Sequence, residues 1–130
     1  MKPHPPDPKP ATKQKKRGDW AEALALAHLS QQGLQLYQRN YQCKTGEIDL
    51  IMKDQDTLVF VEVRFRSDST RGSPLETVTV SKQKKIIRTA SFFLQQHYGD
   101  RWPACRFDVV GILKKKTCET EINWIKSAFY

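Results

Sequence analysis

Apolar and polar residues alternate along two successive stretches near the middle of the chain. The stretches are GEIDLIMK (46–53) and LVFVEVRFR (58–66), and the polar turn DQDT lies between them. An alternation of period two is typical of β-strands, so this segment is predicted to be a hairpin. The same pattern predicts a strand before it, over 34–43, and two strands after it, over 105–113 and 121–129.

Two other segments have the apolar spacing of helices. DWAEALALAHLSQQG predicts a helix over 19–33 that is closed by Gly33. A second helix is expected from Thr79 or Ser81 to His97, because one stripe of it is apolar. That stripe consists of Ile86, Ala90, Phe93 and Leu94. The predicted order is α-β-β-β-α-β-β, which indicates an α/β fold with a mixed central sheet flanked by helices.

The first 17 residues differ from the rest of the chain. They hold five of the seven prolines and no large aliphatic or aromatic residue, so we expect residues 1–17 to be a disordered tail and 18–130 to be the folded domain. The net charge is +8, of which the tail carries +5 through five Lys, one Arg and one Asp. A basic balance favours a polyanionic partner such as nucleic acid. A tail that only aids solubility is an equally good interpretation.

Cysteine usage and hydropathy indicate the compartment. The three cysteines are odd in number and show no C-x-x-C spacing, which favours a reducing environment over a disulfide framework or a zinc site. The sequence has no apolar run long enough to span a membrane and no signal peptide. We therefore expect a cytoplasmic protein with no membrane contact.

The predicted hairpin carries an acid in each strand. If residues 55–56 form the turn, Asp49 lies directly opposite Glu62, with their Cβ atoms roughly 4.5–5.5 Å apart. Strand alternation places Arg64 on the face of Glu62 and Glu47 on the face of Asp49. Two carboxylates this close need a shared proton, a guanidinium or a divalent metal between them.

A surface ladder is the alternative interpretation of the same residues. In it, Glu47 and Arg64 form an ordinary cross-strand pair, and the acids face water. The strongly apolar residues of the hairpin favour a functional site instead, because they bury much of the sheet around the acids.

The motif G-E-I-D followed by E-V-R resembles the signature of the PD-(D/E)XK nuclease superfamily. More closely, residues 18–130 resemble the bacterial YraN family. The resembling stretches are WAEALALAHLSQQG, QRNYQCKTGEIDLIM, LVFVEVRFR, SKQKKI and RFDVVGI. The resemblance implies a restriction-endonuclease-like αβββαβ core related to archaeal Holliday junction resolvases. Those relatives cleave phosphodiester bonds with Mg²⁺ and recognise branched DNA as dimers.

The resemblance also implies a role for each matching residue. Asp49 and Glu62 would bind Mg²⁺ or Mn²⁺, and the backbone carbonyl of Val63 would complete the metal shell. Arg64 stands where the superfamily has its active-site lysine. Arginine stays protonated and cannot act as a base, although it can stabilise charge on a phosphate. Another lysine could take that place, and Lys82 is one candidate.

Glu22 has two interpretations that the sequence leaves open. It matches an acid on the first helix of the resolvase-like relatives, where it contributes to the metal site. Asp19 and Glu22 also have the spacing of a capping box, with Asp19 as the N-cap.

Basic residues flank the predicted site. Four residues open the second helix: Lys82, Gln83, Lys84 and Lys85. The positive charge of the three lysines opposes the helix dipole unless an anion such as a phosphate is bound. The resemblance implies that Gln83 faces the active site, because nuclease relatives often carry a polar residue there. Arg66 and Arg71 follow the third strand and could border a DNA channel. A solvated helix face and a surface loop are the alternatives.

Asp108 is a further acid among apolar residues, in the stretch RFDVVGI. Strand alternation places it on the same face as Arg106, with which it could pair. Support of the metal site from a distance is the other interpretation.

The leading hypothesis is a Mg²⁺-dependent endonuclease that acts on branched or single-strand-containing DNA in recombination or repair. The second is a non-cleaving nucleic-acid-binding module, a partner of a helicase or recombination factor, which Arg64 keeps open. A third is an RNA- or ribosome-associated protein that binds mainly through its basic tail.

Overall fold

The computed structural model describes residues 13–67 and 73–130, which form a five-stranded mixed sheet. The strands lie side by side in sequence order: β1 (Gln35–Cys43), β2 (Gly46–Asp54), β3 (Thr57–Ser67), β4 (Cys105–Lys114) and β5 (Thr120–Phe129). β3 and β4 are parallel, and the other neighbouring strands are antiparallel. All five predicted strands are therefore confirmed.

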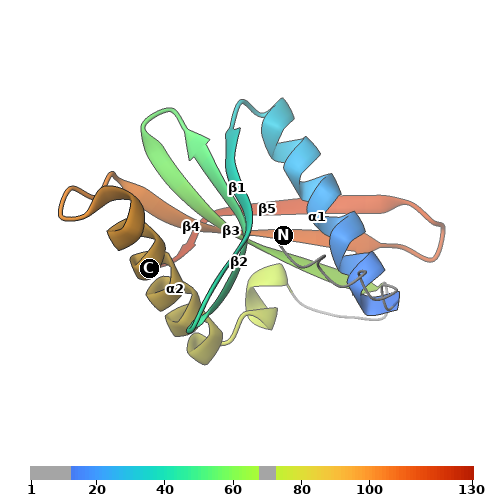
Figure 1. Cartoon of the computed structure of the whole chain (residues 1–130). Helices are drawn as coiled ribbons and strands as arrows, with labels where there is room; N and C mark the ends of the chain where they lie inside the picture. Colours follow the sequence, from blue (N-terminus) through green and yellow to red (C-terminus); the bar gives the residue numbers. More distant parts are fainter. Residues whose placement is uncertain (1–12, 68–72) are drawn as a thin grey trace, which may run out of the picture.

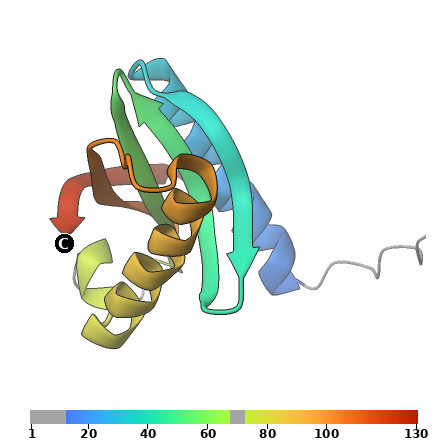
Figure 2. The ribbon, with the colours of Figure 1, turned by 60° about the vertical axis from the view of Figure 1, so that its left-hand side comes forward.

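Two long helices cover the two faces of the sheet, α1 (Lys13–Gln31) on one side and α2 (Val80–Tyr98) on the other (Figures 1 and 2). A short 3-10 helix, η1 (Pro74–Thr77), precedes α2. The order of elements is the predicted one, and the arrangement is consistent with a restriction-endonuclease-like αβββαβ core. No helix in the described residues is long and apolar enough to cross a membrane.

Each helix buries its apolar side against the sheet. Ala21, Ala25 and Leu29 of α1 pack on residues of β2, β3 and β4, among them Leu50, Val61 and Val110. On the other face, the predicted stripe of α2 is buried in a second core cluster, together with apolar residues of the sheet. That stripe consists of Ile86, Ala90, Phe93 and Leu94. Because helices cover both faces of β2 and β3, an acidic side chain in these strands is shielded from solvent.

The β2–β3 hairpin has the predicted register. Asp54 pairs with Thr57 and Leu50 with Val61, around a turn in which Gln55 has a positive φ of 54°. In the described residues the ladder ends at Leu50–Val61, whereas β2 stays paired with β1 as far as Gly46. Asp49 and Glu62 thus lie just beyond the last hydrogen-bonded pair, where the hairpin opens.

Helix α1 begins earlier than predicted. It starts at Lys13, so its first residues lie in the segment expected to be a disordered tail, and residues 1–12 fall outside the described part of the chain. Asp19 lies within the helix and is no N-cap. The capping-box interpretation of Asp19 and Glu22 is therefore wrong, because the lysine-rich stretch before Gly18 continues the helix.

Helix α2 lies within one residue of its predicted limits. Thr79 is its N-cap, and the Thr79 hydroxyl accepts a hydrogen bond of 3.1 Å from the Lys82 amide. Gly99, with φ 57°, ends the helix.

Asp108 ties β5 to β4 from a fully buried position. Its carboxylate accepts hydrogen bonds from Arg106 Nε (3.1 Å), Trp124 Nε1 (2.9 Å) and the Ser127 amide (2.9 Å). The Arg106 guanidinium continues to Asp54 at 2.9 Å. The predicted pairing with Arg106 is confirmed, and within the described residues no contact of Asp108 leads to Asp49 or Glu62.

Candidate functional site

A cleft of ≈ 320 Å³ opens beside the end of the β2–β3 ladder, facing the first turns of α2. Both acids of the hairpin, Asp49 and Glu62, line it. The other polar side chains at its wall are Thr45, Glu47, Lys82, Lys85 and Thr89. The cleft therefore holds carboxylates on the sheet side and lysines on the helix side.

Asp49 is held in a fixed orientation and in an unfavourable environment for its charge. Its Oδ2 accepts a 2.8 Å hydrogen bond from the Val63 amide, across the opening of the hairpin. Burial, followed by the negative charge of Glu62, raises the pKa of Asp49 to about 8, and the hydrogen bond from the Val63 amide offsets only part of this rise. An added positive charge would relieve this strain on the ionised carboxylate.

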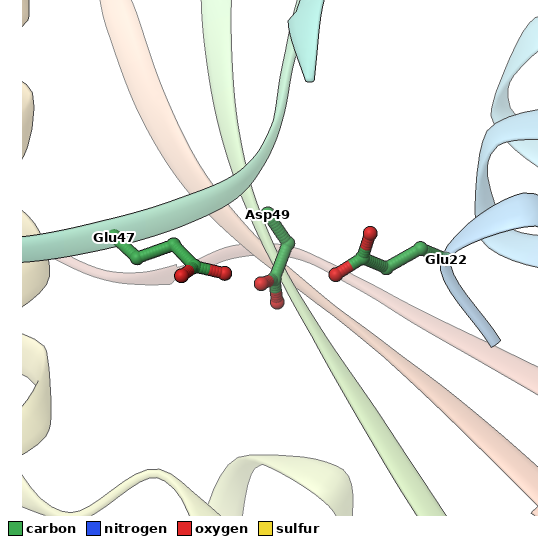
Figure 3. Close-up of side chains that lie close together, drawn as sticks. All are labelled: Glu22, Glu47 and Asp49. Carbon is green, nitrogen blue, oxygen red and sulfur yellow. The ribbon is translucent and has the colours of Figure 1, made fainter. Parts of the chain in front are cut away.

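Glu22 and Glu47 lie on either side of Asp49. One oxygen atom from each of the three carboxylates lies within 4.8 Å of the others, and the side chains point toward one another (Figure 3). Glu22 comes from α1, and its Oε2 is buried with no hydrogen-bond partner in the described residues. Burial is the main cause that raises the pKa of Glu22, followed by the charges of Asp19 and Glu47. The predicted proximity of Glu22 to Asp49 is present.

Glu62 is paired with cations, unlike Asp49. It is only 6% exposed, and its Oε1 lies 2.8 Å from Lys82 Nζ and 3.6 Å from Arg64 Nη1. The surface-ladder interpretation is wrong. Glu62 is buried, and Glu47 accepts a hydrogen bond from Gln42 while Arg64 turns to Glu62.

Arg64 is anchored by η1. Its Nε donates a 3.0 Å hydrogen bond to the Thr77 hydroxyl, which in turn donates to the Pro74 carbonyl at 2.6 Å. The guanidinium is thus fixed beside Glu62, which lines the cleft. It can stabilise negative charge there, but it cannot take up a proton.

The position of η1 depends on a close contact with β4, and it can be tested there. A Cβ added at Gly111 would lie 2.2 Å from Pro74 Cγ, so Gly111→Ala should displace η1 and release Thr77 from Arg64. We expect a loss of about 1–3 kcal/mol in urea unfolding, as for an overpacked core site. Gly18→Ala is the control, since nothing lies within 4 Å of its added Cβ, and it should be neutral or stabilising. Equal unfolding free energies for Gly111→Ala and the wild type would contradict the contact.

The basic residues predicted to bind nucleic acid are placed differently from one another. Lys82 and Lys85 line the cleft, whereas Lys84 is exposed outside its wall. The Gln83 amide donates to the Val78 carbonyl at 3.0 Å, which secures the start of α2. Arg66 is half-buried, and Arg71 lies outside the described residues.

Sequence reasoning did not anticipate the hydroxyl groups of the cleft. Thr89 Oγ1 lies 2.9 Å from Thr45 Oγ1, which lies 3.1 Å from Cys43 Sγ. Gly46 packs against this group, because a Cβ there would lie 3.2 Å from Thr89 Oγ1. The signal was available in Thr89, a polar residue inside the apolar stripe of α2.

The donor atoms of the site suit a hard divalent cation. They are carboxylate oxygens, which Mg²⁺ and Mn²⁺ prefer. The raised pKa of Asp49 and the unpartnered Oε2 of Glu22 indicate that these two carboxylates lack a neighbouring positive charge. The cleft therefore fits the cation that the resemblance implies. The Val63 amide contacts Asp49, and the role of the Val63 carbonyl as a ligand stays a prediction.

Comparison with known proteins places this chain in a family. Residues 21–112 match the model described as "Uncharacterised protein family UPF0102". A UPF0102 protein of Stutzerimonas stutzeri is 52% identical over 114 residues, which cover 86% of this chain and 92% of that protein. Another, from Nitrosococcus oceani, is 46% identical over 121 residues, 93% of this chain and 96% of that protein. The YraN family and UPF0102 are the same family. The chain therefore belongs to the UPF0102 family.

Proposed function

We propose that this protein is a divalent-cation-dependent DNA endonuclease, structure-selective for branched DNA in the manner of a Holliday junction resolvase. The observation that carries the proposal is the convergence of Asp49 and Glu62, from two strands, in a cleft that lysines close on its other side. Buried carboxylates that face positively charged side chains are typical of phosphoryl-transfer sites, where catalysis depends mainly on positioning and on neutralisation of charge.

Each residue of the site would have a separate role in the reaction. Asp49 and Glu62, which line the same cleft, would hold the cation, and the Val63 amide keeps Asp49 oriented. Glu22, which lies beside Asp49, would add a third carboxylate. When bound, Mg²⁺ or Mn²⁺ supplies Lewis acidity and lowers the pKa of water. Arg64, fixed by Thr77, would neutralise charge that develops on the scissile phosphate.

The DNA would approach along the lysine side of the cleft. Lys85 lines the cleft from an exposed position on α2, and Lys84 is exposed on the same helix, so both can reach a phosphate backbone. The preference for branched DNA, a homodimeric assembly and a partner among helicases or recombination factors are extended from the resemblance to archaeal resolvases.

Cleavage of a synthetic four-way junction tests the proposal. We expect the wild type to nick the junction with Mg²⁺ or Mn²⁺, to be inactive in EDTA and to leave a matched linear duplex largely intact. Asp49→Asn and Glu62→Gln should each abolish nicking, by at least about a thousandfold, because each removes a ligand of the catalytic cation. Wild-type nicking in EDTA, or an active Asp49→Asn variant, would contradict it.

A non-cleaving DNA-binding module is the second candidate, and the presence of Arg64 at the lysine position favours it. A permanently protonated guanidinium binds phosphate well but cannot act as a base. If the wild type binds the junction but never nicks it with either cation, this second function is the correct one. If deletion of residues 1–12, which precede α1, removes all binding, the basic tail and not the cleft carries the interaction.

A further inference from the structure

Lys82 of α2 places a positive charge beside Glu62 in the cleft, as Arg64 of β3 does from the sheet. Its ammonium is 2.8 Å from Glu62 Oε1, the same oxygen that Arg64 approaches at 3.6 Å. Lysine at the third residue of a helix is disfavoured by the helix dipole. Its ion pair with the buried Glu62 carboxylate offsets that cost and holds the side chain in the cleft.

The two cations at Glu62 differ in how they are held. The Arg64 guanidinium is fixed by the Thr77 hydroxyl, which is itself bonded to Pro74. Lys82 is a flexible four-carbon stem whose side chain is 40% exposed, so its ammonium can leave Glu62 and stay within the cleft. Of the two, Lys82 is the one that can move without breaking a hydrogen bond to η1.

A divalent cation and the Lys82 ammonium cannot both sit against Glu62 without strong repulsion, because they are like charges a few ångströms apart. We propose that Lys82 is a built-in counter-ion that competes with the divalent cation for the Glu62 carboxylate and, once displaced, binds a phosphate of the nucleic acid. The inference rests on the proposed function. It adds that one lysine weakens cation binding and strengthens DNA binding.

Removal of the Lys82 ammonium should change cation affinity and DNA affinity in opposite directions. Removing the ammonium with Lys82→Met frees Glu62, so Mn²⁺ should bind at least about fivefold more tightly, the lower end of usual coupling between two sites. The same variant should bind a four-way junction more weakly, and the slope of log affinity against log salt should fall by about one phosphate contact.

Lys85→Met is the matched control. Lys85 lines the same cleft, and no ion pair joins it to Glu62 in the described residues. It should therefore lose junction affinity like Lys82→Met without any gain in Mn²⁺ affinity. This comparison separates competition at the carboxylate from a general change of charge in the cleft.

Titration of Mn²⁺ into the full-length wild type, Lys82→Met and Lys85→Met, followed by calorimetry, is the test, with junction binding measured in Ca²⁺. Tighter Mn²⁺ binding by Lys82→Met alone, together with weaker junction binding, is the expected result. If the wild type binds Mn²⁺ and Lys82→Met binds it equally well or more weakly, this inference is overturned and the proposed function stands. If the wild type binds no Mn²⁺, the proposed function fails as well.

Discussion

Replacing Asp49 by asparagine should make the cation-free protein more stable at pH 8. In the wild type the folded state holds a proton on Asp49 up to about pH 8, whereas an unfolded aspartate releases it near pH 4. Because the folded state binds the proton more tightly, wild-type stability falls as pH rises from about 4 to about 8. An asparagine side chain at this position carries no charge, and its carbonyl can still accept the hydrogen bond from the Val63 amide.

The size of the effect follows from the shift. Each pKa unit is worth about 1.4 kcal/mol, so over the three pH units from 5 to 8 we expect the stability advantage of Asp49→Asn to grow by up to about 4 kcal/mol. Urea unfolding in EDTA at several pH values measures it. Asp56→Asn, in the exposed hairpin turn, is the control and should show no such trend. An advantage that is independent of pH, or a less stable variant at pH 8, would show that Asp49 is not an electrostatically strained acid.

Replacing Asp108 by alanine should cause the largest loss of stability. The carboxylate is fully buried and satisfies Arg106, the Trp124 indole and the Ser127 amide at once. Removing one partner of a buried ion pair typically costs about 3–5 kcal/mol, because the other charge stays behind. Urea unfolding should show a loss of this size, and the fluorescence of Trp124 should shift as its hydrogen bond is lost.

Two further variants separate the network from a general effect of removing an acid. Asp108→Asn keeps a side-chain acceptor and should lose less stability than Asp108→Ala. Asp100→Ala, at an exposed position after α2, should lie within about 0.5 kcal/mol of the wild type. A loss below about 1 kcal/mol for Asp108→Ala would mean that β5 is held mainly by its ladder with β4.

Most of the fold could be predicted because its signals are local. Alternation and turn composition located the strands, and counting from the turn at Gln55 gave the observed β2–β3 register. That register placed Asp49 and Glu62 at the same point of the hairpin, and both line the cleft. The start of α1 was missed, because lysine and glutamine are good helix formers that composition alone assigned to the tail.

The partners of the acids could not be predicted from strand geometry. Alternation assumes a continuous ladder between the two strands. The β2–β3 ladder ends at the Leu50–Val61 pair, so Glu47 lies near Glu22 and not opposite Arg64. The ion pair between Lys82 and Glu62 depends on how α2 docks on the sheet, which no local pattern in the sequence specifies. Thr77 anchors Arg64 through η1, a short helix that was not predicted from the sequence.

Binding of Mn²⁺ to the wild type and to Asp49→Asn is the most direct test of the central claim, that the carboxylates of this cleft form a cation site. Titration followed by electron paramagnetic resonance counts free Mn²⁺ and needs no nucleic acid. We expect saturable binding by the wild type and none by Asp49→Asn, although the variant should be folded and more stable at pH 8. Equal binding by both proteins, or no binding by the wild type, would contradict the claim.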